Sequence, residues 1–505
     1  MKGCMYLQRH FAPLGHILIT LLRERHGIDS WCGYVLDRAN LAFLENQKEI
    51  PYSALLLEDD VVAQYKNEVL DMEYLAALER EYGIPNLWPH LICDRVIRYN
   101  LYRRAYPSDV SLYSHEEMMR MVQTTARAII NFFDREKPDF IFFSVVGNLS
   151  SMLLYHIAKK KGIQTLLLDG ARIGIKYFLS ERYDRSTFLE ETVARLRKSL
   201  RPGDPRFREA ERFLAEFRRA PRYFLEASGG AGAVLEGFKR SRLAHFSFLS
   251  PRKFWRSLRW TLFAFSEYAR KSRREDYIVM HPWHELLDKV KRKARILRGY
   301  GALYDEPVAG EDFAYFALHT EPEAYPMILA PFYTDQLWLA KQIARSLPLS
   351  CKLYVKDHPV MTGLRLRSYY RELKKLPNVR LLHPKVSGLR LIRESKLTLT
   401  LTGTTGFEAA LLKKPVILFG PMYYSRLLGV KVCSDINQLP YLVKTQLEEF
   451  RSDETELVTL IAALMEESID LELVQMWDLG EGEREARRKW LIPLSDLIAK
   501  KLGVT

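Results

Sequence analysis

The stretch that most constrains the fold of this chain runs from Leu397 to Gly420. Alternating Leu and Thr residues, Leu397 to Leu401, predict a strand, and the polar loop Thr402 to Gly406 ends it. Phe407 to Lys413 then favours a helix, and a second apolar run, Val416 to Phe419, follows the proline that stops this helix. Strand, loop, helix and strand in this order form the parallel α/β unit. The sequence therefore predicts an α/β protein with parallel sheets.

The loop in this unit carries groups that suit the phosphates of a nucleotide. Its glycines let a ligand approach the backbone closely, and the start of the following helix offers unpaired N–H groups at the positive end of its dipole. The hydroxyls of Thr402, Thr404 and Thr405 add donors, and Glu408 could accept hydrogen bonds from ribose. The alternative is structural: Thr404 or Thr405 would cap the helix, with Glu408 as its capping-box partner.

A second strand end carries similar chemistry. Lys356, His358 and Pro359 directly follow a short apolar strand, about 40 residues before the glycine-threonine loop. Ligands of open α/β sheets bind beyond the carboxyl ends of the strands, where both loops would lie. The His-Pro pairs at His281 and His383 lack this context. We therefore expect the ammonium group of Lys356 and the imidazole of His358 to donate to phosphate oxygens.

Short motifs that include these two elements follow one another along the chain. They are Phe316-Ala-Leu-His-Thr-Glu-Pro-Glu323, Asp335-Gln336, Leu347-Pro348, Val355-Lys-Asp-His-Pro359, Leu391-Ile-Arg-Glu-Ser395, Thr402-Gly-Thr-Thr-Gly406, Glu408-Ala409 and Lys414-Pro-Val-Ile-Leu-Phe-Gly420. In this order they resemble the bacterial capsule polysaccharide biosynthesis family, which includes Kdo transferases and related surface-carbohydrate glycosyltransferases with the GT-B fold. The resemblance covers about residues 310 to 430, is weaker before residue 190 and is absent from about 190 to 300.

The resemblance implies both a fold and a donor site. The fold would be α/β and GT-B-like, with two Rossmann-type parallel-sheet domains facing a cleft, a helical insertion between them and a C-terminal helix. His358 and the loop around Thr404 and Thr405 would hold the donor phosphates, and Glu408 the ribose. The donor-binding residues expected are Lys356, His358, Pro359, Thr402, Gly403, Thr404, Thr405, Gly406, Glu408, His319 and Glu321.

Four segments follow from the patterns along the chain. Residues 1–185 are expected to form the first, acceptor-binding domain, with a β-α-β start in which Gly15 lies at the strand-to-helix turn. Residues 186–309 read as a helical, basic, aromatic-rich insertion, and residues 310–480 as the donor domain. Residues 481–505 read as a C-terminal helix, which by the resemblance crosses back to the first domain.

Transfer also needs a base, which two-domain transferases usually supply from the first domain. Asp169 and Arg172 follow a buried-looking strand, and Arg172 would pair with a carboxylated sugar or a phosphate. Glu58 and Asp60 follow another strand end, although a solvated loop is the favoured interpretation of this acidic cluster. His10 is a further candidate.

Charge and composition limit the partners. The 505 residues carry a net charge of +14, which favours acidic partners, but no nucleic-acid recognition motif is visible. There is no metal-ligand spacing and no Asp-x-Asp between strands, so we expect a metal-free mechanism with no cofactor. The five scattered cysteines, the missing signal-peptide pattern and the missing apolar span predict a cytoplasmic protein. The oligomeric state is not indicated.

The segment Phe246 to Arg274 interleaves Lys and Arg with Trp255, Trp260 and Phe263. This composition suits the headgroup boundary of an anionic membrane, where a lipid-linked acceptor would lie. Peripheral attachment to the inner face of the cytoplasmic membrane follows as one interpretation. The alternative is that the aromatic residues pack this helix onto the domain junction.

Three functions compete. The favoured one is a glycosyltransferase that moves a sugar from a nucleotide-activated donor, by resemblance a CMP-activated acidic sugar such as Kdo, to a glycan or lipid-linked acceptor. The second is a sugar-nucleotide epimerase or a teichoic-type polyol-phosphate transferase on the same scaffold; the latter would be expected to carry a Thr-Asp-Tyr-Ser-Ser type of loop. The third is a non-catalytic assembly scaffold, against which the intact Lys356, His358 and Glu408 count.

Overall fold

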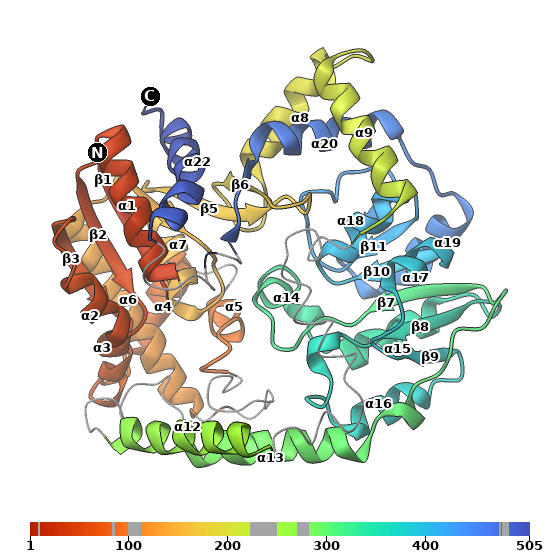
Figure 1. The fold of residues 1–505 in the computed structure, drawn as a ribbon, viewed down its shortest axis with the longest axis horizontal. Coiled ribbons are helices and arrows are strands. Elements are labelled where there is room, and N and C mark those ends of the chain that lie inside the picture. Colours follow the sequence, from red (N-terminus) through yellow and green to blue (C-terminus); the bar gives the residue numbers. More distant parts are fainter. Residues whose placement is uncertain are drawn as a thin grey trace.

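The computed structural model describes residues 1–8, 11–82, 86–98, 111, 113–222, 250–269, 282–473, 476 and 484–504. Two mainly parallel sheets, each flanked by helices, stand side by side (Figure 1). This arrangement of two Rossmann-type sheets confirms the predicted α/β, GT-B-like fold class. The contacts between the two sheets' loops position the candidate site described below.

The first sheet has seven strands in the order β13-β6-β5-β4-β1-β2-β3. Its parallel strands run outward in two directions from the β1–β4 pair, so the strand order reverses there. β6 and β13 are antiparallel additions at one edge. The strands are β1 (Lys2–Leu7), β2 (Ser30–Val35), β3 (Tyr52–Leu57), β4 (Phe140–Phe143), β5 (Gln164–Gly170), β6 (Lys176–Ser180) and β13 (Ile469–Asp470).

Seven helices accompany these strands in the described part of the first domain. They are α1 (Ala12–His26), α2 (Arg38–Glu45), α3 (Glu58–Ala63), α4 (Met72–Tyr82), α5 (Trp88–Ile92), α6 (His115–Glu136) and α7 (Leu149–Lys160). One expectation was wrong: Gly15 lies inside α1, not at the turn before it. A Cβ atom on Gly15 would come within 2.6 Å of the Leu7 side chain, so this glycine serves helix–strand packing.

The second sheet has six parallel strands in the order β12-β11-β10-β7-β8-β9, and its order reverses between β7 and β10. The strands are β7 (Phe313–Ala317), β8 (Lys352–Lys356), β9 (Val379–Leu382), β10 (Leu397–Thr400), β11 (Val416–Leu418) and β12 (Val430–Val432). The α-helices are α14 (Ala324–Leu329), α15 (Gln336–Ser346), α16 (Arg367–Lys374), α17 (Gly388–Glu394), α18 (Thr404–Leu411), α19 (Leu439–Glu448) and α20 (Glu454–Glu467).

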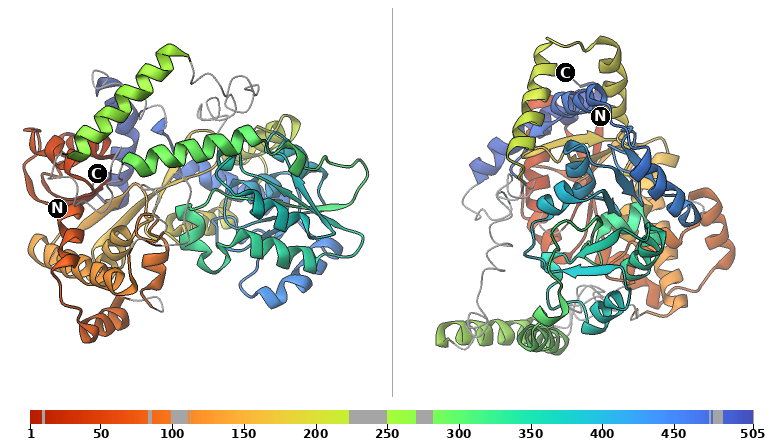
Figure 2. Two further views of the ribbon diagram at one scale, coloured as in Figure 1. Left: turned by 90° about the horizontal axis from the view of Figure 1, so that it is seen from below. Right: turned by 90° about the vertical axis from the view of Figure 1, so that its right-hand side faces the viewer.

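The segment read as a single insertion contains two different parts. α8 (Thr187–Ser199) and α9 (Pro205–Arg219) pack on α20 and share its apolar core. Arg218 reinforces this packing with an ion pair to Glu454, 2.5 Å apart. By contrast, α12 (Pro251–Ala269) and α13 (Pro282–Arg298) form a separate two-helix arm, and α12 projects from the body of the molecule (Figure 2).

The end of the chain returns to the first domain. β13 lies within the range 310–480 expected for the donor domain, yet it pairs with β6 of the first sheet. α22 (Arg484–Leu502) packs along α1, burying Leu491, Leu494 and Ile498, as Figure 1 shows. The C-terminal helix therefore lies on the first domain. Within the described ranges, no helix has the length and apolar character needed to span a bilayer.

Candidate functional site

Three loops meet at the carboxyl edge of the second sheet, where its strand order reverses. His319 follows β7, the residues from Thr402 follow β10, and His358 follows β8. The Nε2 atom of His319 lies 2.5 Å from the carbonyl oxygen of Thr402, which ties the first two loops together. This reversal point is where ligands bind in open α/β sheets. The two motif elements read from the sequence therefore lie on one edge, with β7 between them.

Gly403 shapes the start of α18. Its backbone has φ 151° and ψ −173°, a conformation that is essentially restricted to glycine. A Cβ atom there would lie 3.2 Å from Nε2 of His319, and the Gly403 carbonyl accepts a hydrogen bond from the Tyr424 hydroxyl at 2.5 Å. The glycine thus brings the backbone close to His319 while its carbonyl stays paired.

The helix begins earlier than predicted. Gly403 is the N-cap, no side chain caps α18, and the helix starts at Thr404 instead of Phe407. The capping alternative is therefore wrong: neither Thr404 nor Thr405 is the N-cap, and the buried Glu408 lies beyond the first turn. Among the described residues, the buried hydroxyl of Thr402 has no hydrogen-bond partner. The start of α18 offers N–H groups and hydroxyls to a ligand.

His358 is held as a hydrogen-bond donor. Its Nδ1 atom accepts from the backbone N–H of Val360 at 3.3 Å, which leaves the ring proton on Nε2. Burial, together with the charges of Lys356 and nearby groups, lowers the pKa of His358 to about 3, so the ring is neutral near pH 7. Burial lowers the pKa of Lys356 to about 8, opposed by Asp357 and Glu408. Both side chains therefore present donors at neutral pH.

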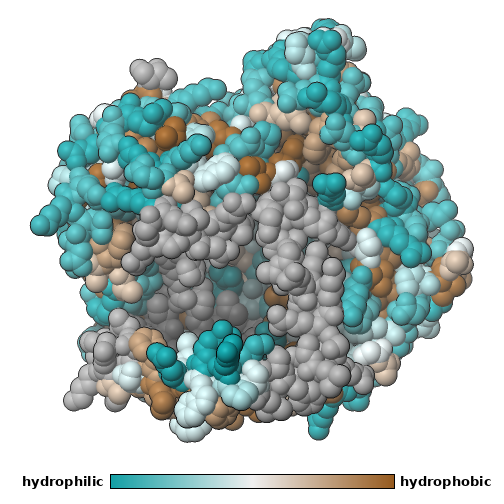
Figure 3. Space-filling view, viewed as in Figure 1, coloured by the Kyte–Doolittle hydropathy of each residue, from teal (hydrophilic) through white to brown (hydrophobic). Residues whose placement is uncertain are grey.

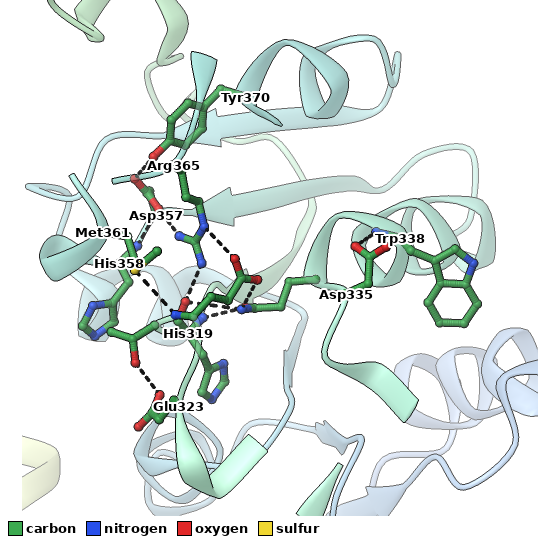
Figure 4. A network of polar contacts seen from close by, with 12 residues as sticks. His319, Glu323, Asp335, Trp338, Asp357, His358, Met361, Arg365 and Tyr370 are labelled. Carbon is green, nitrogen blue, oxygen red and sulfur yellow. Dashed lines mark hydrogen bonds and ion pairs between the residues drawn. The ribbon is translucent and has the colours of Figure 1, made fainter. Parts of the chain in front are cut away.

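A buried arginine, Arg365, connects the loops that follow β7 and β8 (Figure 4). Arg365 is fully buried and donates to Oδ1 of Asp357 and to the carbonyl oxygen of His319, both at 2.5 Å. Its Nε donates to Oε2 of Glu321 at 3.3 Å. The hydroxyls of Tyr370 and Tyr304 donate to Oδ2 of Asp357 at 2.7 and 3.2 Å. Arg365 thus fixes the ends of β7 and β8 relative to each other.

This network explains two residues that sequence reasoning placed differently or missed. Glu321 was expected in the donor site, but its carboxylate binds Arg365 and accepts from Nε2 of Gln336 at 2.5 Å. Burial raises the pKa of Glu321, against the opposing effect of Arg365. Arg365 itself was missed. The available signal was Asp357, because a carboxylate at the end of a buried strand requires a cationic partner.

A cavity of about 320 Å³ opens between the two sheets beside α18. Its walls bring together Arg172 of the first sheet and Thr404 and Glu408 of the second. The end of α9 closes the third side. The lining residues are Arg172, Gly174, Phe213, Glu216, Phe217, Arg219, Ala220, Arg222, Thr404, Phe407, Glu408 and Leu411. Glu216 and Arg219 were not anticipated, because nothing in the charged helix α9 marks these positions in the sequence.

Asp169 lies within β5, not in a loop after it, and lines a smaller neighbouring cavity. The hydroxyl of Tyr325, from α14 of the second domain, donates to its Oδ1 at 2.7 Å, and Nη2 of Arg172 lies 3.9 Å away. The two domains also touch where Gly147 meets Ala324; a Cβ on Gly147 would come within 2.6 Å of the Ala324 Cβ. Asp169 and Arg172 therefore stand at the domain interface.

Glu58 and Asp60 line neither of these two cavities, although Oε1 of Glu58 accepts from Nδ2 of Asn148 at 3.4 Å, next to Gly147. They begin α3 after β3, which is the edge strand farthest from β5 and β6. Glu58 is buried, whereas Asp60 is exposed and pairs with Arg38 at 2.6 Å, so the expected solvated loop is a helix. His10 and His281 lie outside the described residues. No cluster of three metal-binding side chains occurs in the described part of the chain.

The fold and site define a two-domain α/β protein with its candidate site at a strand-order reversal. Residues 335–432 match the family model described as capsule polysaccharide biosynthesis protein. This segment holds β8, Arg365, β10 and α18, and the match confirms the resemblance to that family there. No curated protein matches the chain.

Solved structures give only distant likenesses. The beta Kdo 2,7 transferase of KpsC from Thermosulfurimonas dismutans is 12% identical, with a TM-score of 0.37 over 76% of this chain and 90% of that one. The beta Kdo 2,4 transferase of the same protein is 14% identical, with a TM-score of 0.34 over 65% and 80%. A UDP-GlcNAc 2-epimerase from Methanocaldococcus jannaschii is 13% identical, with a TM-score of 0.27 over 92% and 99%. Such scores do not distinguish a transferase from an epimerase.

Proposed function

We propose that this protein is a glycosyltransferase of bacterial capsular polysaccharide biosynthesis that uses a nucleotide-activated sugar. The favoured donor is a CMP-activated acidic sugar such as Kdo, and the acceptor is a glycan or a lipid-linked glycan at the inner face of the cytoplasmic membrane. The observation that carries the proposal is the cavity that joins Arg172 of the first domain to Thr404 and Glu408 of the second. Such a cavity suits a reaction between a donor on one domain and an acceptor on the other.

The leaving phosphate would be stabilised without a metal ion. The Nε2–H of His358, the ammonium group of Lys356 and the uncapped start of α18 supply donors from the end of β8 and from α18. The hydroxyls of Thr404 and Thr405 lie in the first turn of this helix. Preorganised donors of this kind stabilise the charge that develops as the nucleotide departs.

Asp169 is the proposed base for the acceptor hydroxyl, and Arg172 the proposed partner of the sugar carboxylate. Tyr325 donates to one carboxylate oxygen of Asp169 and so fixes its orientation from the other domain. Arg172 adopts a left-handed backbone conformation with φ 59°, which a non-glycine residue rarely holds without a reason. Its position on the cavity wall, near Asp169, places a cation where an acidic sugar would lie.

A nucleotide-binding screen tests the proposal first. CMP, UDP and GDP would be titrated by calorimetry with the full chain, and we expect CMP to bind most tightly. Transfer from a CMP-activated acidic sugar should persist in excess chelator. Activity that vanishes with chelator and returns only with Mg²⁺ or Mn²⁺ would reject the metal-free mechanism. Conversion of the sugar nucleotide to its epimer without acceptor would identify an epimerase, and binding of no nucleotide would favour the scaffold.

A further inference from the structure

The arm formed by α12 and α13 exposes large apolar side chains to solvent. On α12, Trp255 is 63% exposed and Phe263 62%, and on α13 Trp283 is 55% and Val290 58% exposed. Figure 3 shows apolar and hydrophilic residues side by side along the lower edge of the molecule, where Figure 1 places this arm. Contiguous exposed apolar surface marks an interaction site in proteins.

The exposed aromatic residues of α12 do not pack against the domain junction. Trp255 and Phe263 would be buried if they packed α12 onto the junction, as the alternative sequence interpretation held, and their exposure contradicts it. The two helices instead hold each other. The rings of Phe265 and Trp283 meet edge to face with centroids 5.4 Å apart, and Nζ of Lys289 lies 3.6 Å above the ring of Trp260. The arm is therefore a unit with its own apolar surface.

Cations flank this surface. Arg252, Lys253, Arg256 and Arg259 of α12 are exposed, and none has an ion-pair partner within the residues that the structure describes. A helix with Trp, Phe and Leu on one side and Lys or Arg on the other lies in the headgroup region of a bilayer. Unpaired cations at that depth attract anionic lipids.

We propose that α12 and α13 form a docking arm for an anionic lipid surface. Trp255 and Leu262, seven residues apart on one face of α12, enter the acyl boundary, while Arg252, Lys253 and Arg256 contact the headgroups. The exposed aliphatic side chains, Leu262 at 60% and Val290 at 58%, favour a bilayer over a nucleic acid, whose backbone offers them nothing to pack against. The use of this docking, to bring the enzyme to a lipid-linked acceptor, rests on the proposed function.

The inner end of the arm is fixed next to the donor site. Nη1 of Arg295 donates to the carbonyl oxygen of Leu364 at 3.1 Å. Ile296 packs on Gly363, where a Cβ atom would come within 2.5 Å and where φ is +75°. This loop connects His358 to Arg365. An arm bound to a membrane would thereby hold the donor-binding edge at a fixed orientation to that membrane.

Vesicle flotation of the full chain tests the proposal. Vesicles of phosphatidylcholine with 30% phosphatidylglycerol would be compared with pure phosphatidylcholine at low and high salt. We expect binding only to the anionic vesicles, weakened by salt. Each cation at such a surface contributes about a five-fold factor, so Arg252→Gln/Lys253→Gln/Arg256→Gln should weaken binding about 100-fold. The matched control Lys375→Gln/Arg390→Gln/Lys444→Gln removes three exposed cations elsewhere and should bind nearly as wild type.

A second measurement separates insertion from charge attraction alone. Brominated lipids should quench tryptophan fluorescence in the wild type, and Trp255→Phe should lose part of that quenching. The proposal is overturned if the wild type ignores anionic vesicles, or if the α12 triple variant binds as well as its control. It is also overturned if light scattering shows a dimer that Trp255→Ser/Phe263→Ser abolishes, without vesicle binding. Neither assay uses donor or acceptor, so docking and transfer can fail independently.

Discussion

In each sheet, a helix follows one of the two strands at which the strand order reverses. These two helices, α7 and α18, begin in opposite ways. In the first sheet α7 follows β4, and the side chain of Asn148 accepts from the Ser151 N–H while Ser151 returns a bond to the N-cap. In the second sheet α18 follows β10, and Gly403 gives it no side-chain cap. The first helix therefore has a capping box, whereas the second begins with no side-chain cap on its N–H groups.

The surroundings repeat this contrast. Near α7, the Tyr6 hydroxyl donates to Oδ1 of Asn148 at 3.0 Å, and Nε2 of Gln8 donates to Oγ of Ser144 at 2.7 Å. Near α18, by contrast, neither Nζ of Lys356 nor Nε2 of His358 donates to an acceptor among the residues that the structure describes. The carboxyl edge of the first sheet therefore pairs its polar side chains internally. The carboxyl edge of the second sheet, here called the receptive edge, keeps the donors of Lys356 and His358 available.

The largest expected effect comes from removing the arginine that supports the receptive edge. Arg365→Met leaves Asp357 buried without its cation, which should cost about 3–5 kcal/mol in the free energy of unfolding. Urea unfolding of the variant measures this loss. The double variant Arg365→Met/Asp357→Asn should recover part of it, because Glu321 is then the carboxylate of this network left without its cation. Equal stability of the single variant and the wild type would contradict the support role.

His358→Ala should lower transfer by about 100-fold or more, because one preorganised donor to the leaving phosphate is lost. Steady-state kinetics with the donor found in the binding screen measures the change. His383→Ala is the matched control: Nδ1 of His383 accepts from the Lys385 N–H at 3.0 Å, as Nδ1 of His358 accepts from Val360. Equal rates for the two variants would remove His358 from the site.

The first domain should show a pH-dependent stability from a buried histidine pair. Burial lowers the pKa of His90 to about 3 and that of His156 to about 4, and their ring centroids lie 5.0 Å apart. The folded protein keeps both rings neutral, while the unfolded chain binds protons below about pH 6.5. Stability is therefore complete above pH 6.5 and falls as the pH drops towards 4.

Between pH 7 and pH 5, His90 should account for a loss on the order of 2 kcal/mol. Urea midpoints at the two pH values measure the change, and His90→Leu should flatten it. An unchanged pH dependence in His90→Leu would show that other groups carry the acid sensitivity.

The smallest effect should come from uncapping α7. Asn148→Ala removes its N-cap and should lower the free energy of unfolding by about 1 kcal/mol. Nucleotide affinity should stay the same, because this helix start is not the receptive one. A loss of nucleotide binding comparable to that of His358→Ala would break the contrast between the two edges.

The sequence predicted the strands of the site well, because short apolar runs end sharply at turn residues. The strand expected at Leu397–Leu401 is β10 at Leu397–Thr400. The start of α18 was missed because the conformation of Gly403 depends on His319, which lies far away along the chain. Arg365 was missed because it stands among leucines and arginines that resemble a surface segment. β13 has only two residues, too few for any pattern.

The pairing of β13 with β6 has a mechanical consequence. The chain leaves the first domain just after β6 and comes back to it at β13, so both covalent connections between the domains run through adjacent strands. Two domains joined through one pair of adjacent strands can move by hinge opening and closure about that pair, but they cannot rotate freely about each other. Opening of this hinge would break the hydrogen bond between Tyr325 and Asp169 at the domain interface. Closure would bring these two side chains back to the same relative position each time.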